Sequence, residues 1–420
     1  MKHLYYHSDN RLHLENVDLA ALGKELSSPF YIYSKNEILR NCQKVKTIAG
    51  DLNFMPCYAI KANYNPRILE LIQETGFGAD VVSGGELHFA LKCGFPAEKV
   101  VFAGVGKTRA EIVAAVSAGI HSLNIESESE LEQVAAVAAE LNKEVLISVR
   151  VNPDIDAKTH PYISTGLLAN KFGVTRETAR NMYLRASRLP NIVPAGIHVH
   201  IGSQIETAGP YIETIDFINE FIKELAAAGI NIRYVDLGGG IGIDYHNQLH
   251  SSGFPQTHID AILPQVLDPF RGRDLNVLLE LGRSIIGSAG LLITKVLYIK
   301  QTPLKKFIVV DAAMNNLMRP SLYQAYHQIV PLVQSDRKPE KVDVVGPVCE
   351  TTDFFARDRM LPELKEGDMI AITGAGAYGQ SLASNYNLRP MLAEYLVSED
   401  RYQTIFKGET IDAIENKYTV

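Results

Sequence analysis

The sequence has few cysteines, no long apolar run and no excess of positive charge, and each shortage excludes a class of protein. Its four cysteines form no C-x-x-C pair, which argues against a disulfide framework and a cysteine-based zinc site. No apolar stretch is long enough to cross a bilayer, and polar Ser8-Asp9-Asn10 stands where a secretory signal would have its apolar core. The net charge of −7 includes no lysine- or arginine-rich run to attract nucleic acid. We therefore expect a cytoplasmic protein that binds neither membrane nor nucleic acid.

The middle of the chain alternates short apolar runs, typical of buried strands, with amphipathic segments that open on helix-capping boxes. The predicted strands are Asn53–Ile60, Ala79–Ser83, Lys99–Ala103, Ser122–Ile125, Val145–Val151, Ala195–Ile201, Arg233–Leu237 and Asn276–Leu279. Eight such units favour an α/β fold of the (β/α)8 TIM-like barrel type over the alternative, an open doubly wound sheet. In a barrel, the carboxyl ends of all strands converge on one face, where active sites lie.

After about residue 290 the sequence pattern changes, and strand-like segments follow one another with few helices between them. Ile293–Ile299, Phe307–Val310, Val342–Val345 and Met369–Thr373 predict a C-terminal all-β domain, a Greek-key barrel or sandwich. Near the N-terminus, two short apolar segments around the turn Ser8-Asp9-Asn10 predict a hairpin. We expect residues 1–28 to pack on the β-domain, residues 29–285 to form the barrel, and residues 286–420 to form the β-domain.

Two glycine-rich segments imitate nucleotide-binding motifs. Gly104-Val105-Gly106-Lys107-Thr108 ends like a phosphate-binding loop, but Val101 stands where that motif requires its first glycine. The pattern G-x-G-x-x-G is matched by Gly374–Gly379, but this segment lies in the expected β-domain. The residues that follow it are poor helix formers, whereas a dinucleotide site requires a helix there. We interpret both segments as structural loops.

Polar residues at the ends of predicted barrel strands indicate chemistry. Lys61 closes an apolar strand, where it is either a lysine whose amine reaches solvent or one that forms an imine with an aldehyde cofactor. His198 and His200 alternate on a strand, so both point the same way. They could bind a metal, although neither has an acidic or cysteine neighbour in the sequence, or an imidazole could stack on a cofactor ring.

The ends of two later strands carry glycines and a carboxylate. Gly238-Gly239-Gly240 is longer than a tight turn requires, and its backbone N–H groups suit a phosphate. Glu280 needs a positively charged partner, which is either Arg283 or the protonated nitrogen of a pyridine ring. These residues together offer what pyridoxal 5'-phosphate (PLP) requires: an amine that forms an imine, an imidazole that stacks on the ring, N–H groups that bind the phosphate, and a carboxylate that pairs with the pyridinium nitrogen.

At these residues the chain resembles the PLP-dependent decarboxylases with the alanine-racemase-like fold, over nearly its whole length. The shared segments are Tyr58–Asn63, Asp80–Leu87, His200–Gln204 and Asp236–Gly240. Further segments resemble the diaminopimelate decarboxylase branch of this group: Thr159–Gly166, Asn170–Gly173 and Arg319–Tyr323. Two positions depart from the family's usual residues, with Leu281 in place of proline and Thr351 in place of serine.

The resemblance implies a role for each candidate residue. Lys61 would carry the cofactor as an imine, His200 would lie against its ring, and Glu280 would face the pyridine nitrogen. The other implied cofactor contacts are Ser203, Gly239, Gly240, Gly282, Arg283 and Tyr378. The implied substrate contacts are Arg283, Arg319, Tyr323, Glu350 and Tyr378, and Cys349 is implied as a catalytic residue that the partner subunit supplies together with Glu350.

The resemblance also implies a reaction, the decarboxylation of meso-2,6-diaminopimelate to L-lysine in a homodimer whose active sites are shared between subunits. Two arginines suit a substrate with a distal carboxylate and would repel a diamine substrate, which argues against ornithine or arginine decarboxylase. Two alternatives stay open. One is a related PLP decarboxylase for another acidic amino acid, and the other is a non-catalytic binding protein on the same fold.

Overall fold

A computed structural model describes residues 3–156, 171–246, 249 and 257–418 of the chain. The chain divides into two compact units. One unit comprises residues 41–242 and 258–284, and the other comprises residues 1–40, 243–257 and 285–420. The second unit takes in residues 29–40, which we had assigned to the barrel, because strand β4 (Phe30–Ser34) pairs with two strands from the C-terminal part of the chain.

The first unit is a closed barrel of parallel strands, which confirms the predicted fold class. Successive strands are neighbours around the barrel, and the last pairs with the first. Its strands are β5 (Phe54–Ala59), β6 (Gly78–Val81), β7 (Val100–Phe102), β8 (Ser122–Ile125), β9 (Val145–Arg150), β10 (Ile192–His198), β11 (Tyr234–Asp236) and β12 (Asn276–Leu281). All eight of these strands overlap the strands predicted from the sequence.

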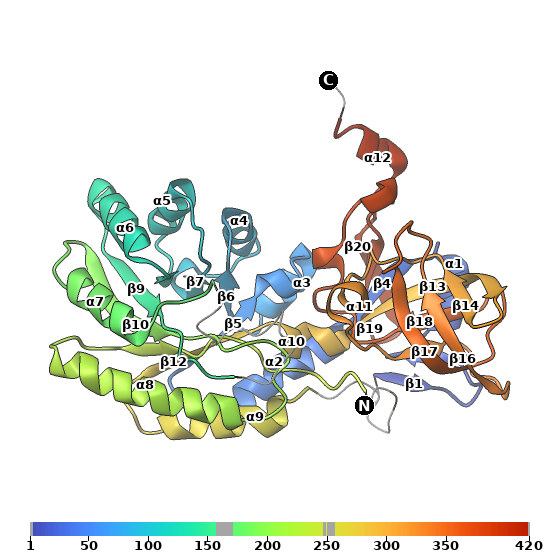
Figure 1. Cartoon of the computed structure of the whole chain (residues 1–420), viewed down its shortest axis with the longest axis horizontal. Helices are drawn as coiled ribbons and strands as arrows, with labels where there is room; N and C mark the ends of the chain where they lie inside the picture. Colours follow the sequence, from blue (N-terminus) through green and yellow to red (C-terminus); the bar gives the residue numbers. More distant parts are fainter. Residues whose placement is uncertain (1–2, 157–170, 247–248, 250–256, 419–420) are drawn as a thin grey trace. The chain divides into compact units, whose positions relative to one another are not determined.

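Amphipathic helices follow the barrel strands, and Figure 1 shows α4 to α8 around the outside of the barrel. The helices are α2 (Lys35–Ala49), α3 (Pro66–Gln73), α4 (Gly84–Lys92), α5 (Arg109–Ala118), α6 (Glu128–Leu141), α7 (Arg176–Ala186), α8 (Gly209–Ala227) and α9 (Ile259–Leu267). The predicted capping box of Thr108 and Glu111 begins α5, and Gly119 ends it in the left-handed conformation. Local capping chemistry therefore sets where this helix starts and stops.

The interior of the barrel has an apolar layer and a polar layer. Cys57, Val101, Ala195, Tyr234 and Leu278, which come from five different strands, pack together in one apolar cluster. Side chains two residues apart on a strand point to the same side of the sheet, so the residue two positions after each member of this cluster also faces the interior. These next positions include the buried polar residues Asp236 and Glu280. The carboxyl end of the barrel is thus where polar groups are buried.

The second unit is built on a mixed nine-stranded sheet and a separate three-stranded sheet. The small sheet contains β1 (Leu4–Tyr6), β2 (Leu12–Leu14) and β3 (Val17–Asp18). The large sheet contains β4 and also β13 (Gly290–Gln301), β14 (Lys306–Val310), β15 (Ile329–Pro331), β16 (Pro339–Val345), β17 (Phe354–Pro362), β18 (Met369–Ile372), β19 (Ala393–Ser398) and β20 (Arg401–Phe406). Short helices complete the unit: α1 (Leu19–Glu25), α10 (Arg283–Ile286), α11 (Arg319–Tyr323) and α12 (Ile411–Glu415).

The N-terminal hairpin shares its core with the large sheet. The side chains of Leu4, Leu12 and Leu14 are fully buried in a cluster that also contains Leu291 and Leu332. The N–H of Leu12 donates to the carbonyl oxygen of Leu332 at 2.8 Å. The apolar face of the hairpin is therefore covered, and its opposite face carries the polar residues.

The two glycine-rich loops do not have the geometry of nucleotide sites. Lys107 is buried, donates to the carbonyl oxygens of Gly104 and Asn124, and forms an ion pair with Glu130 at 2.7 Å. A Cβ at Gly376 would lie 1.9 Å from the carbonyl oxygen of Ile286, so glycine is needed there for close packing. Both loops are structural, as we expected.

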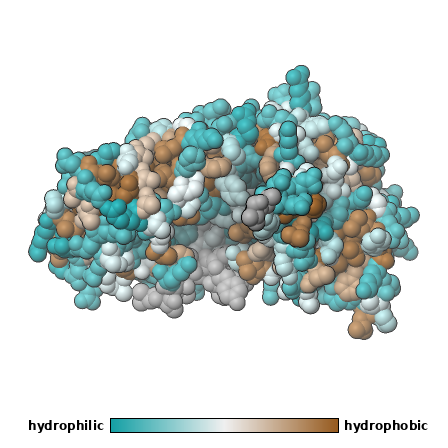
Figure 2. All heavy atoms as spheres, turned by 90° about the horizontal axis from the view of Figure 1, so that it is seen from above, coloured by the Kyte–Doolittle hydropathy of each residue, from teal (hydrophilic) through white to brown (hydrophobic). Residues whose placement is uncertain are grey.

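No helix in the described part of the chain is both long and apolar enough to cross a membrane. The face of the molecule drawn in Figure 2 is mostly hydrophilic, with smaller apolar patches between the polar residues.

Candidate active site

Lys61 lies at the carboxyl end of β5, in a short 3₁₀ turn (Ile60–Ala62) that follows the strand. Its amine is 2.6 Å from a carboxylate oxygen of Asp80, which is fully buried on the neighbouring strand β6. Burial and the nearby Glu280 raise the pKa of Asp80 above its usual value, although Lys61 acts to lower it. The Lys61 side chain is 35% exposed, so a cofactor can reach an amine that Asp80 holds in place.

Glu280 ends β12 with a carboxylate that is 3% exposed. One of its oxygens is 3.3 Å from Nε2 of His198 on β10. Burial alone would raise the pKa of Glu280, but the charge and hydrogen bond of His198, followed by the charge of Lys61, hold it well below its usual range. The same interaction raises the pKa of His198, because Glu280 and Asp236 more than offset the effect of burial. Glu280 is thus kept ionised inside the barrel, and its charge favours the protonated form of His198 beside it.

Asp236, at the end of β11, belongs to the same buried cluster. Burial and the charge of Glu280 raise the pKa of Asp236. Its oxygens accept hydrogen bonds from the side chain of Asn124 at 3.2 Å and from the N–H of Gly238 at 3.0 Å. The sequence places no acidic neighbour close to His198, but the folded barrel brings two carboxylates to it. The fold brings ligand atoms of His198, Asp236 and Glu280 within 4.8 Å of one another.

His200 follows β10 and sits beside the three glycines. Burial, followed by the charge of Arg150, lowers the pKa of His200 to about 3, so its imidazole is neutral at physiological pH. The N–H of Gly239 donates to its Nδ1 at 2.9 Å. Since Nδ1 accepts this hydrogen bond, the proton of the neutral ring lies on Nε2. The ring is therefore fixed in one tautomer and one orientation.

The glycine segment is needed for packing as well as for any ligand. A Cβ at Gly238, Gly239 or Gly240 would lie 2.5, 2.1 or 2.4 Å from a backbone carbonyl oxygen. Our inference that a tight turn would not need three glycines was therefore wrong, because each position has a steric reason of its own. The N–H groups of Gly238 and Gly239 donate within the barrel. The backbone N–H of Gly240 donates no hydrogen bond to an acceptor among the described residues.

Arg283 and Ser203 lie together near this end of the barrel. Arg283 is 6% exposed and donates from Nη2 to the Ser203 hydroxyl at 3.1 Å. Gly282 lets this segment approach the turn that carries Lys61, since a Cβ there would lie 3.0 Å from Cβ of Ala62. Arg283 is therefore a buried cation and not a surface residue.

The remaining candidates belong to the second unit, in which Arg319 is also buried. It is 4% exposed, and its Nη1 is 2.7 Å from Nε2 of His327. Nδ1 of His327 donates to the carbonyl oxygen of Thr373 at 2.8 Å, so Nε2 accepts from Arg319. The guanidinium carbon also lies 4.6 Å from the centre of the Tyr245 ring. A buried cation held by a neutral histidine and an aromatic face suits an anionic ligand.

Cys349 and Glu350 lie on an exposed loop after β16. The carboxylate of Asp353, which is 4% exposed, accepts hydrogen bonds from the N–H groups of Met314 and Val348 at 2.7 Å and so anchors the loop. Glu350 accepts a hydrogen bond from the hydroxyl of Tyr386 at 2.8 Å. Both candidate side chains thus project from a loop that buried hydrogen bonds hold in place.

Two tyrosines complete the predicted set. Tyr323 ends α11, the helix that begins with Arg319. Tyr378 has a φ of 55°, which is unusual for a residue other than glycine. Such strained positions concentrate at functional sites. The segment Thr159–Gly166 and Asn170, which carried part of the resemblance, lies outside the described residues.

From the sequence we considered His198 as a metal ligand or a ring-stacking imidazole, but we assigned no role to Asp80, Asp236 or Arg150. Arg150 is buried on β9 and is 3.1 Å from a carboxylate oxygen of Glu126. The signal that could have found these three residues was the same one that found Glu280, namely an ionisable side chain within an otherwise apolar strand.

The comparisons with known proteins agree with this geometry. A family model described as "Pyridoxal-dependent decarboxylase, pyridoxal binding domain" matches residues 35–287. The chain therefore belongs to the family of pyridoxal-dependent decarboxylases.

Within this family, the similar curated proteins carry a more particular name. The chain is 44% identical to the diaminopimelate decarboxylase of Aquifex aeolicus over 406 residues, which is 97% of this chain and 95% of that protein. It is 43% identical to the diaminopimelate decarboxylase of Vibrio cholerae over 414 residues, covering 99% of this chain and 98% of that protein.

A solved structure points the same way. The crystal structure of diaminopimelate decarboxylase from Helicobacter pylori, complexed with L-lysine, matches with a TM-score of 0.89 and 42% identity, covering 95% of this chain and 99% of that one. A lysine decarboxylase from Selenomonas ruminantium shares the fold with a TM-score of 0.80, at 23% identity.

The residues present fit PLP. Its aldehyde needs an amine, and Lys61 provides one at the mouth of the barrel. Its pyridine nitrogen needs a carboxylate that stays ionised, and Glu280 is a buried carboxylate with a lowered pKa. Its phosphate needs donors, and the N–H of Gly240 and the hydroxyl of Ser203 lie at this end of the barrel.

Proposed function

We propose that this chain catalyses the decarboxylation of meso-2,6-diaminopimelate to L-lysine and carbon dioxide, the last step of lysine biosynthesis, with PLP as its cofactor. The observation that carries the proposal is the buried, ionised Glu280 at the barrel end where Lys61 presents its amine. The printed names of the similar proteins supply the substrate. When bound, PLP supplies an electron-withdrawing ring that stabilises the carbanion left after carbon dioxide departs.

In this proposal each barrel residue has a role toward the cofactor. Lys61 would hold the aldehyde of the cofactor through Nζ, and the ionised Glu280 would favour a proton on the ring nitrogen. The neutral His200 would serve as the ring neighbour of the cofactor, because a charged imidazolium would repel a positive pyridine ring. Gly239 acts through His200, because its N–H fixes the ring of that histidine.

Buried arginines and the exposed loop would handle the substrate. Arg283 and Arg319 each offer a carboxylate of the substrate a forked pair of hydrogen bonds, and Tyr323 and Tyr378 are further candidate substrate contacts. Glu350 pairs with the distal ammonium group, and the thiol of Cys349 returns a proton to the carbon that lost carbon dioxide. The exposed departure at Thr351 is next to these two residues, so it bears on substrate choice.

We further propose a cytoplasmic homodimer in which Cys349 and Glu350 of one subunit serve the barrel of the other. Cys349 is exposed in the single chain, which is unusual for a free thiol unless a partner or substrate covers it. All four cysteines are free, as expected in a reducing compartment.

The test is carbon dioxide release by the purified, PLP-loaded protein from meso-diaminopimelate, L-lysine, L-ornithine and L-arginine. We expect release from meso-diaminopimelate alone. Lys61→Ala should abolish both this release and the visible absorbance of the bound cofactor, whereas Lys92→Ala, which removes an exposed lysine on α4, should change neither. Release from a different amino acid would replace the substrate, and unchanged absorbance in Lys61→Ala would refute the cofactor assignment.

A further inference from the structure

The hairpin of β1 and β2 has an apolar face and a face that carries histidine. Its strands pair in the register Leu4 with Leu14, Tyr5 with His13 and Tyr6 with Leu12. Because successive side chains alternate between faces, burial of the leucines sends His13 to the opposite face. His7 comes two residues after Tyr5, so it continues the same face and lies diagonally across from His13. The register that buries the leucines therefore brings two imidazoles together.

The turn of this hairpin adds a carboxylate. Hydrogen bonds of 2.9 Å from the N–H of His7 to the carbonyl of Arg11, and from the N–H of Asn10 to the carbonyl of His7, hold the turn closed. The N–H of Arg11 also donates to Oδ1 of Asp9 at 3.2 Å. This hydrogen bond fixes the orientation of the Asp9 side chain, which stays 52% exposed to solvent.

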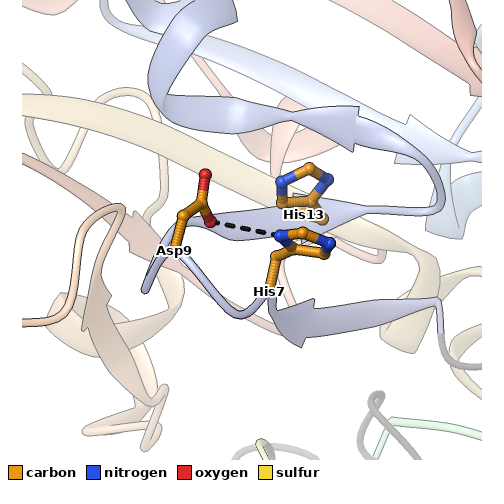
Figure 3. A group of neighbouring side chains, drawn as sticks. All are labelled: His7, Asp9 and His13. Carbon is orange, nitrogen blue, oxygen red and sulfur yellow. Dashed lines mark ion pairs between the residues drawn. The ribbon is translucent and has the colours of Figure 1, made fainter.

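The three side chains converge, as Figure 3 shows. Nδ1 of His7 is 3.4 Å from Oδ1 of Asp9, and the ring centres of His7 and His13 are 5.2 Å apart with a tilt of 37°. One ligand atom from each of the three residues lies within 4.8 Å of the other two. The ring of Tyr5 stacks on His13 at 5.7 Å and restricts its orientation.

We propose that His7, Asp9 and His13 form a surface site for a divalent transition-metal ion such as Zn²⁺. Two imidazole nitrogens and one carboxylate oxygen are donors that zinc and copper accept, whereas Mg²⁺ and Ca²⁺ prefer oxygen alone. Three ligands from one hairpin, two near its turn and one on β2, leave further coordination positions for water. The bound ion closes the hairpin turn and stabilises this sheet of the second unit.

The neighbouring cation does not occupy the site. Nε of Arg11 is 3.6 Å from Oδ2 of Asp9, the oxygen other than the one nearest His7. Arg11 is engaged more closely by Asp18, at 2.7 Å. Asp9 can therefore offer Oδ1 to a metal while Arg11 keeps its ion pair.

The experiment is a calorimetric titration of the PLP-loaded, full-length protein with Zn²⁺ at a pH where histidine is neutral. Cys349 and the buried barrel cluster are other places where zinc can bind, so the measurement compares variants. His7→Ala, His13→Ala and the double variant remove ligands from a face that makes no part of the apolar core. His88→Ala, which removes an exposed histidine on α4, is the matched control.

We expect the double variant to bind one equivalent of Zn²⁺ fewer than the wild type, and each single variant to bind it more than about tenfold more weakly. His88→Ala should bind as the wild type does. Zn²⁺ should also raise the melting temperature of the wild type and of His88→Ala more than that of the double variant. Equal stoichiometry and affinity in the wild type and the double variant would overturn the proposal. A melting curve without zinc that matches the wild type shows that the variants are folded.

Discussion

At the residue scale, the candidate site depends on which buried groups carry charge. His198 and Glu280 form a pair inside the barrel, and their pKa shifts have opposite directions. The pair matters for the proposed function because the Glu280 carboxylate must stay ionised to hold a proton on a pyridine ring. Removal of either partner leaves the other as a buried charge without its counter-charge.

Replacing His198 by glutamine tests this pair. The pKa of His198 is raised in the folded state, so its contribution to stability is complete below the usual histidine pKa and disappears as the pH rises through the raised value. We expect His198→Gln to lower the free energy of unfolding by roughly 1–3 kcal/mol near pH 6, and by less as the pH increases. The measurement is denaturant unfolding at a series of pH values.

The control is His121→Gln, for which we expect the loss of stability to change with pH in the opposite direction. Burial lowers the pKa of His121, so its protonation destabilises the folded state as the pH falls. His121→Gln should therefore lose less stability relative to the wild type at acidic pH than at neutral pH. If both variants showed the same pH trend, the assigned charge of His198 would be wrong.

At the scale of strands and helices, local patterns were sufficient for the barrel but not for the sheet. Each barrel strand is a short, mostly apolar run, so the sequence predicted all eight. Side-chain caps begin some of the helices that follow, such as α5 and α6, but not α8 or α9. Strand β4 was missed because its partners, β13 and β19, come from the far end of the chain. Local periodicity contains no information on such pairings.

The same limit explains the missed site residues. A strand's alternation says which side a residue such as His198 or Asp236 faces, but not how close it lies to a residue on another strand. Lys61, His200 and Glu280 were found because each ends a strand with chemistry that an apolar environment does not tolerate. Their mutual distances required the closed barrel.

The glycine segment after β11 provides a prediction at this scale. A Cβ at Gly239 would lie 2.1 Å from the carbonyl oxygen of Glu280, so Gly239→Ala must displace either that strand or the segment that supports His200. We expect a loss of about 1–3 kcal/mol in stability and weaker retention of the cofactor. Melting temperature and visible absorbance after dialysis measure the two effects.

Gly106→Ala is the matched control for Gly239→Ala. A Cβ at Gly106 would meet no atom within 4 Å, although this glycine also lies in a loop after a barrel strand. Its stability and cofactor absorbance should equal those of the wild type. An equal response of the two variants would show that the close approach at Gly239 is not important.

At the scale of the whole molecule, the candidate residues are divided between two compact units. Lys61, His200 and Glu280 belong to the barrel, whereas Arg319, Cys349 and Glu350 belong to the sheet unit. The loop of Cys349 contacts Tyr386 and Asn387, and the neighbouring Leu388 is 64% exposed. An exposed apolar residue near the exposed thiol of Cys349 is what the proposed subunit interface would cover.

The proposed sharing of active sites between subunits predicts that two inactive variants can restore each other. Lys61→Ala damages the barrel, and Cys349→Ala damages the loop, so each homodimer has two defective sites. In a hybrid dimer, one site receives both defects and the other receives neither, because a symmetric pair exchanges the same patch in both directions. Mixing equal amounts under conditions that allow subunit exchange should restore about a quarter of the wild-type carbon dioxide release from meso-diaminopimelate.

The control is a mixture of Lys61→Ala with Glu280→Ala. Both substitutions lie in the barrel, so this mixture should restore no activity. If the first mixture stayed inactive although exchange was shown by differently tagged subunits, each chain would have to complete its own site.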